Sequence, residues 1–160
     1  MSKSKITCPF KNEPIIEFYV CPSPEWTSVK RKENPNFAVP NPIKVRGLID
    51  TGFDGGLLIH QPLLRPWGLK TRNFVKITSI KASTEGFFGE YAWETDLCLR
   101  FEIGNSRQGN VQIDLIPATL VEFMNVESYT AIIGCQILQS CTFVYDGPKM
   151  RFTLAFHKQF

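Results

Sequence analysis

The residues of this sequence best placed to do chemistry are Asp50, Thr51 and Gly52, which follow one another directly. They end an apolar run, Gly47-Leu48-Ile49, which is typical of a strand that leads into a tight turn. In such a turn backbone N–H groups can bond the carboxylate, and Gly52 lets another backbone approach closely. The Thr51 hydroxyl can both donate and accept a hydrogen bond, so it can fix the turn to a neighbouring chain. The pattern favours a positioned carboxylate, which suits acid–base chemistry.

An Asp-Thr-Gly sequence is short, and by itself it also fits an ordinary turn in which Asp50 caps its own backbone. A second segment, residues 131–138, strengthens the catalytic interpretation. It reads Ala-Ile-Ile-Gly-Cys-Gln-Ile-Leu and combines a β-branched pair, a glycine at position 134 and the start of an apolar helix.

Together, the two segments resemble the retropepsin-like aspartic peptidases, the family of the retroviral proteases. In that family a strand ending in Asp-Thr-Gly crosses a later apolar-apolar-Gly-x-x-x-Leu segment, and the two form the floor of the active site. The continuation Gly52-Phe53-Asp54-Gly55 is most similar to small bacterial and archaeal members, and the resemblance extends from Pro14 to Phe156. It implies an aspartic endopeptidase with an all-β fold: a closed barrel with one short helix, functional as a twofold homodimer.

The resemblance also implies roles for individual residues. Asp50 corresponds to the catalytic aspartate, and Thr51 to the residue whose hydroxyl reaches the partner chain. Gly52 corresponds to the residue whose backbone supports the catalytic pair. Gly134 corresponds to the glycine of the second crossing segment.

Substrate binding is assigned by the same resemblance to a flap and to the residues after the catalytic turn. Where viral enzymes have a small residue, this chain has Phe53, which either fills the core under the loop or forms a wall of the cleft. Where they have Arg, it has Cys135, so Asp54, whose counterpart pairs with that Arg, must find another partner or stay exposed. The candidate substrate-binding residues are Phe53, Asp54, Gly86 and Gly89.

Peptide hydrolysis by carboxylates requires two of them together, because one takes a proton from water while the other donates a proton. The two share a proton, since like charges about 3 Å apart cannot both ionise. The sequence contains a single Asp-Thr-Gly, so the second carboxylate is expected from another copy of the chain across a twofold axis. Segments 15–20 and 142–156 are expected to form the interface, since exposed strand edges seek partners. No metal or other cofactor is expected.

The rest of the sequence predicts one all-β domain, because prolines and glycines punctuate short runs rich in β-branched and aromatic residues. Residues 1–13 are expected to form an N-terminal tail, and residues 14–160 a single retropepsin-like domain. The prolines of segment 21–42 predict a long loop or irregular hairpin that includes Lys30-Arg31-Lys32. Helical turns are expected at 61–67 and 135–139, and strands at 15–20, 44–49, 57–59, 74–80, 91–101, 111–116, 130–133, 142–145 and 150–156.

Composition and cysteine pattern argue against several other classes. The net charge of +3 is small and the charges are scattered, which argues against nucleic acid as a partner. The five cysteines form no Cys-x-x-Cys pair and no signal-like segment precedes them, so reduced thiols in a cytoplasmic protein are expected. His60 and His157 fit no zinc spacing, and no apolar stretch is long enough to cross a membrane. The expected partners are a second copy of the chain and a peptide or protein substrate.

Two other kinds of function are consistent with the sequence. The same domain could be catalytically silent and serve dimerisation or peptide binding, with Phe53 blocking the cleft, although the intact Asp50-Thr51-Gly52 argues against this. An unrelated small β-barrel that binds a ligand or an oligonucleotide would need a basic and aromatic face, which no segment shows. Serine or cysteine nucleophiles would need a Gly-x-Ser-x-Gly turn or a credible histidine partner, and the sequence has neither.

Overall fold

The computed structural model describes residues 4–10, 12–69, 74–76, 91–103, 110–121 and 128–157. Most of the described residues lie in strands, which confirms the all-β class. Two of the predicted substrate-binding residues, Gly86 and Gly89, lie outside the described residues. Within the described part of the chain, no helix is long and apolar enough to cross a membrane.

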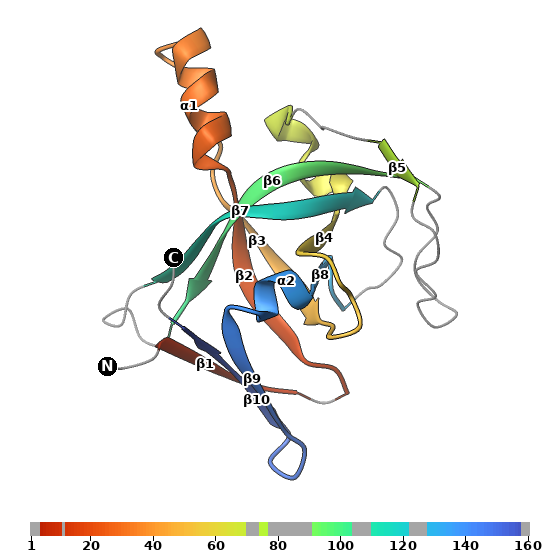
Figure 1. The fold of residues 1–160 in the computed structure, drawn as a ribbon. Helices are drawn as coiled ribbons and strands as arrows, with labels where there is room; N and C mark the ends of the chain where they lie inside the picture. Colours follow the sequence, from red (N-terminus) through yellow and green to blue (C-terminus); the bar gives the residue numbers. More distant parts are fainter. Residues whose placement is uncertain are drawn as a thin grey trace.

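A closed β-barrel forms the centre of the molecule (Figure 1). In order around the ring, its strands are β2 (Ile15–Pro22), β3 (Ile43–Ile49), β8 (Ala131–Ile133), β4 (Leu57–His60), β7 (Asn110–Val121) and β6 (Tyr91–Glu102). Pairing of β2 with β6 closes the ring, and β5 (Phe74–Lys76) pairs with β6 outside it. Most neighbours are antiparallel, but β3 and β8 are parallel, as are β4 and β7.

The barrel strands form because their side chains alternate between the core and the outside. Along β2, for example, buried residues alternate with more exposed ones. The inward-facing residues of β2 and β6 are almost completely buried; they are Ile16, Phe18, Val20, Leu97, Leu99 and Phe101.

A second, three-stranded sheet packs against one end of the barrel. It contains β1 (Ser4–Pro9), β10 (Arg151–Phe156) and β9 (Cys141–Asp146), in that order. The prediction of a tail for residues 1–13 is therefore wrong for β1, which pairs with β10 along its whole length. Phe152 and Phe156 of β10 join the barrel core, and the Phe156 ring lies 5.1 Å from that of Phe101.

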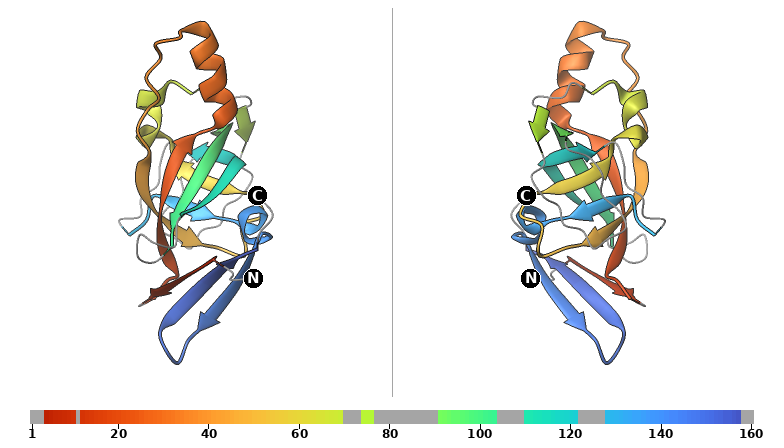
Figure 2. Two further views of the ribbon diagram at one scale, coloured as in Figure 1. Left: turned by 90° about the vertical axis from the view of Figure 1, so that its left-hand side faces the viewer. Right: turned by 90° about the vertical axis from the view of Figure 1, so that its right-hand side faces the viewer.

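The predicted loop at 21–42 contains instead a ten-residue helix, α1 (Pro24–Glu33), so the fold has more helix than the single short one expected. The prolines of this segment predict a loop, but at the first position of a helix the missing N–H of Pro24 costs nothing. The Ser23 side chain caps the helix by accepting a hydrogen bond from the Trp26 N–H at 3.2 Å. The basic run 30–32 forms the last turn, where it complements the helix dipole. No residue of α1 is buried, and the helix projects from the barrel at the end opposite the β9–β10 hairpin (Figure 2).

The other short helices lie where the sequence predicted them. Two 3-10 turns, η1 (Gln61–Leu63) and η2 (Arg65–Trp67), follow β4. Gly68 ends η2 in the left-handed region, with φ of 60°. The helix α2 (Cys135–Leu138) starts one residue after β8. Gly134 alone separates α2 from β8, the strand that pairs with β3.

Replacing Ser23 by Ala should weaken α1 selectively, because it removes the acceptor for the Trp26 N–H. The expected cost is about 1 kcal/mol of helix stability, measured as faster hydrogen exchange of the α1 amides with little change in the barrel. Ser28→Ala is the matched control, since Ser28 lies inside the same helix and is exposed. Equal acceleration in both variants would show that the cap does not hold the helix.

Candidate active site

Asp50 lies immediately after β3, where the chain leaves the barrel. Its backbone N–H donates to the carbonyl of Ile133 at 3.0 Å, which continues the parallel pairing of β3 with β8. β8 lies between β3 and β4, and pairs with β4 in antiparallel register. Because β8 is buried along its whole length, Asp50 emerges beside a closely packed part of the barrel.

The turn after β3 fixes the orientation of the Asp50 carboxylate through a backbone hydrogen bond. The Gly52 N–H donates to Oδ1 of Asp50 at 2.8 Å, and the Phe53 N–H donates to the Asp50 carbonyl at 3.3 Å. Asp50 is half-buried, whereas Thr51 and Gly52 are exposed. The carboxylate therefore has a fixed orientation and remains open to solvent on one side.

The second predicted segment closes against this turn through backbone contacts (Figure 1). The Gly134 N–H donates to the Gly56 carbonyl at 2.8 Å, and the Cys135 N–H donates to the Phe53 carbonyl at 2.7 Å. A Cβ atom on Gly134 would lie 2.6 Å from the carbonyl oxygen of Phe53, which is too close for any side chain. Glycine is thus required at position 134 because two backbone segments cross there.

Phe53 folds back under its own loop. Its ring would contact Cβ atoms built on Gly55 and Gly134, so it occupies the space that those two glycines leave. The side chain is half-buried and packs against a small apolar cluster made of Leu58, Val121, Tyr129 and Ile132. This position matches the core alternative for Phe53 more closely than the cleft-wall alternative.

Cys135 and Asp54 stand at the positions where the viral enzymes have an ion pair between an Arg and an acidic residue. The Cys135 thiol donates to the Thr51 carbonyl at 3.1 Å, so it holds the Asp50 turn without a charge. Asp54 is exposed, and in the described part of the chain it forms no ion pair. A thiol that bonds a backbone carbonyl needs no anionic partner, and this leaves the Asp54 carboxylate to solvent.

Tyr129 is a residue near the site that sequence reasoning missed. It lies just before β8 and is 8% exposed. Burial raises the pKa of its hydroxyl, and the negative charges of Glu13 and Asp50 raise that pKa further. The phenol therefore stays protonated close to the Asp50 carboxylate. No local pattern could have revealed it, because Glu13 reaches Asp50 through the pairing of β2 with β3, and Tyr129 reaches it through the pairing of β3 with β8.

The described residues supply one carboxylate on a rigid turn and no metal centre. Among them, no three His, Cys, Asp or Glu side chains are grouped so that they could hold a metal ion. The arrangement can therefore orient one acid–base group, and two-carboxylate chemistry would need a second group from outside this chain. No family model matches the sequence, and a search of the curated proteins finds no match either.

Replacing Phe53 by Ala should destabilise the fold, because the ring fills the space under the Asp50 turn. We expect a loss of about 3 kcal/mol, the low end for a phenylalanine, since the side chain is only half-buried. Phe37→Ala is the control: Phe37 is also half-buried, but its ring lies against Trp26 of α1, with the ring centroids 5.5 Å apart. Thermal and denaturant unfolding measure both variants, and an unchanged midpoint for Phe53→Ala would exclude the core position.

Proposed function

We propose that this chain is an aspartic endopeptidase of the retropepsin-like kind, active as a homodimer. The observation that supports this most is the geometry of Asp50. Its carboxylate sits at the end of β3, is oriented by the Gly52 N–H at 2.8 Å, and rests on the crossing with the Gly134 segment. A close crossing made by backbone atoms is more than an ordinary solvent-exposed turn requires.

In the proposed reaction, two Asp50 carboxylates, one from each chain, share a single proton. The ionised carboxylate takes a proton from a water molecule, which attacks the carbonyl carbon of the peptide bond. The protonated carboxylate donates to the carbonyl oxygen, so a tetrahedral intermediate forms without a covalent bond to the protein. Its collapse releases an amine and a carboxylic acid, and the pair returns to its starting protonation.

The homodimer follows from the single carboxylate that each chain provides. In a twofold dimer a residue on the axis meets its own copy, so Asp50 can pair only with Asp50 of the second chain. Thr51 is exposed beside it and is free to reach the partner's turn, as the resemblance implies. The substrate is then a peptide or protein bound across the two chains.

One of the two predicted interface segments needs correction. Residues Tyr19 to Pro22 of β2 are paired with β6, and Tyr19 and Val20 are also paired with β3. Backbone groups bonded on both sides cannot pair with another chain, so this part of β2 has no free edge. The sheet of β1, β10 and β9 is the better candidate, since β1 and β9 lie at its edges among the described strands.

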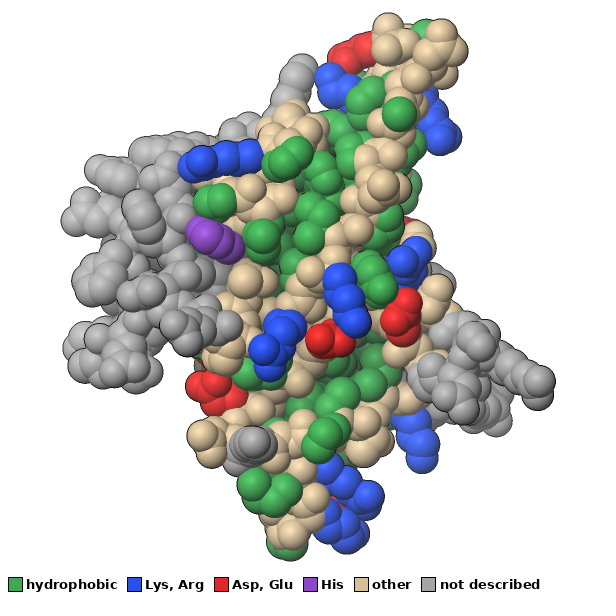
Figure 3. All heavy atoms as spheres, turned by 180° about the vertical axis from the view of Figure 1, so that it is seen from behind, with side chains coloured by type: hydrophobic (Ala, Val, Ile, Leu, Met, Phe, Trp, Pro, Cys, Tyr) green, Lys and Arg blue, Asp and Glu red, His purple; other side chains and the backbone are tan. Residues whose placement is uncertain are grey.

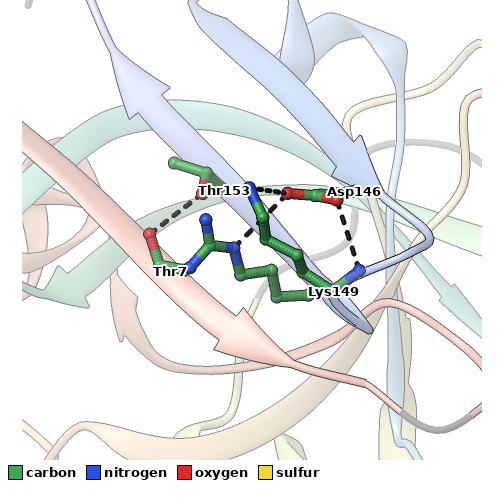
Figure 4. A network of polar contacts seen from close by, with 5 residues as sticks. Thr7, Asp146, Lys149 and Thr153 are labelled. Atoms are coloured by element: carbon green, nitrogen blue, oxygen red, sulfur yellow. Dashed lines mark hydrogen bonds and ion pairs between the residues drawn. The ribbon is translucent and has the colours of Figure 1, made fainter.

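The hairpin of β9 and β10 is suited to such a contact. It exposes three large apolar residues, Val144, Tyr145 and Met150, at about half of their surface each. Figure 3 shows apolar side chains beside Lys and Arg at this end of the molecule. Asp146 holds the turn through ion pairs with Lys149 at 3.4 Å and Arg151 at 3.5 Å (Figure 4). A fixed hairpin with an apolar tip loses little entropy on pairing.

Replacing Asp50 by Asn should abolish cleavage of a peptide library while leaving the fold intact, because Asn cannot accept or share the proton. The expected loss is about a thousandfold or more in rate. Glu25→Gln on α1 is the control, since it neutralises an exposed carboxylate far along the chain from the site. If Asp50→Asn kept its activity, Asp50 would not be the catalytic residue. If the wild-type chain cleaved nothing, the silent dimerisation or peptide-binding alternative would replace the proposal.

The chain should sediment at micromolar concentration with a mass near twice 18.2 kDa. Specific activity should fall on dilution, because dissociation separates the two carboxylates. Changing the exposed Val144 and Tyr145 to Ser should weaken the dimer if the β9–β10 hairpin lies in the interface. A strict monomer at high concentration that retained full activity would contradict the two-chain mechanism.

A further inference from the structure

Two cysteines, Cys21 and Cys98, lie opposite each other where β2 and β6 close the barrel, away from the candidate active site. They are partners in the antiparallel register of the two strands. Their neighbours Val20, Leu97 and Leu99 face the core, so alternation places both thiols on the outer side of the barrel. Cys98 is nevertheless only 3% exposed, Cys21 is half-buried, and both are free thiols.

The spacing of the two residues allows a bond between them. Opposite residues in an antiparallel pair have Cα atoms about 4.5 or 5.5 Å apart, and disulfides span Cα separations of about 4.4 to 6.8 Å. The register of β6 with β7 also shifts between Leu97 and Leu99, so that Cys98 lies opposite two residues of β7 instead of one.

The cysteine pair opens into a cavity of about 550 Å³ between α1 and the barrel. A cavity of this size is in the range of small-molecule sites. Figure 1 shows the base of α1 close to the point where β2, β6 and β7 cross. The lining of the cavity includes the two cysteines, Thr27 and Ser28. Among the described residues that line it, the charged ones are two cations, Arg31 and Lys32.

The surrounding charges make the two thiols unequal. The side-chain interaction with Cys98, helped by the charge of Arg100, lowers the pKa of Cys21 to about 7, against opposing effects of burial and Asp114. The interaction with Cys21, burial and the nearby Asp114 raise the pKa of Cys98, whose thiol donates to the Leu99 carbonyl at 3.9 Å. The Arg100 guanidinium also lies over the Tyr19 ring at 4.7 Å. Near neutral pH, Cys21 is therefore substantially a thiolate while Cys98 keeps its proton.

We propose that Cys21 and Cys98 form a thiol–disulfide exchange site for small, negatively charged disulfides that bind in the cavity between α1 and the barrel. The half-buried Cys21 is the attacking thiol, and the buried Cys98 is the resolving thiol. Arg31 and Lys32 attract the carboxylates of the bound molecule. The site is separate from Asp50 and does not depend on the proposed peptidase activity.

The reaction has two steps. In the first, the Cys21 thiolate attacks one sulfur of R–S–S–R, a Cys21–S–S–R bond forms, and R–S⁻ leaves and takes a proton from water. The mixed disulfide removes the negative charge of Cys21, which is one of the causes that raise the pKa of Cys98. In the second, Cys98 loses its proton to water and attacks the Cys21 sulfur, which forms the Cys21–Cys98 disulfide and releases a second R–S⁻. Two protein thiols are oxidised while one small disulfide is reduced to two thiols.

Oxidised glutathione, added to the reduced full chain under native conditions, tests the proposal. Peptide mapping by mass spectrometry over time should find the first adduct on Cys21 and then a Cys21–Cys98 disulfide. The rate of the first step should rise with pH through about 7, as the Cys21 thiolate forms. A first adduct on Cys8, Cys135 or Cys141, or no disulfide between Cys21 and Cys98, would overturn the proposal.

Two variants separate the roles of the cysteines. Cys98→Ser should trap the mixed disulfide on Cys21, because the resolving thiol is gone. Cys141→Ser should behave as the wild type, since burial raises the pKa of Cys141 to about 11 and keeps it unreactive. If Cys98→Ser fails to fold, Cys98→Ala serves the same purpose, and the order of products in the wild type decides independently. Turnover of the adduct without Cys98 would exclude it as the resolving thiol.

A pair of probes of opposite charge tests the role of the cations. Arg31→Gln with Lys32→Gln should slow the reaction with oxidised glutathione by about threefold to tenfold. The same double variant should react with cystamine, a cationic disulfide, at least as fast as the wild type. Equal slowing of both probes would mean that the cavity does not select negative charge, and this would overturn the proposed ligand class.

Discussion

The placement of β8 between β3 and β4 is the constraint on which the candidate active site depends. β8 pairs with β3 in parallel and with β4 in antiparallel register, and its continuation bonds the backbone of the Asp50 loop. Gly134 has no room for a side chain, because the carbonyl groups of the loop lie against it. Since these contacts are made by backbone atoms in a buried setting, they fix the carboxylate more rigidly than side-chain packing alone could.

The same geometry supplies only one of the two carboxylates that the proposed reaction needs. Asp50 is oriented by the Gly52 N–H, Thr51 is exposed, and Tyr129 keeps its proton near the carboxylate. In the proposed dimer the second carboxylate is Asp50 of the other copy, because a twofold axis brings the same residue of both chains together. The proposed exchange site at Cys21 lies where β2 pairs with β6, away from Asp50, so the two proposals can fail independently.

Much of the fold could be predicted because strand periodicity is local. The strands at 15–20, 57–59 and 130–133 follow from their apolar or alternating residues, and the Asp50 and Gly134 segments follow from their motifs. α1 was missed because Pro24 is a breaker in most settings and a favourable first residue in this one. β1 was missed because its partner, β10, lies at the other end of the chain and leaves no local signal. Tyr129 and the Cys21–Cys98 pair depend on strand register, which no single segment encodes.

The central claim is that two chains each contribute one Asp50 to a shared site, and a mixing experiment tests it most directly. Wild-type and Asp50→Asn chains are combined in equal amounts, left to exchange subunits, and assayed for peptide cleavage at constant total concentration. If both carboxylates are required, only dimers of two wild-type chains are active, and activity falls to about one quarter of an all-wild-type sample. Activity of about one half would mean that each chain acts alone, and this would contradict the account.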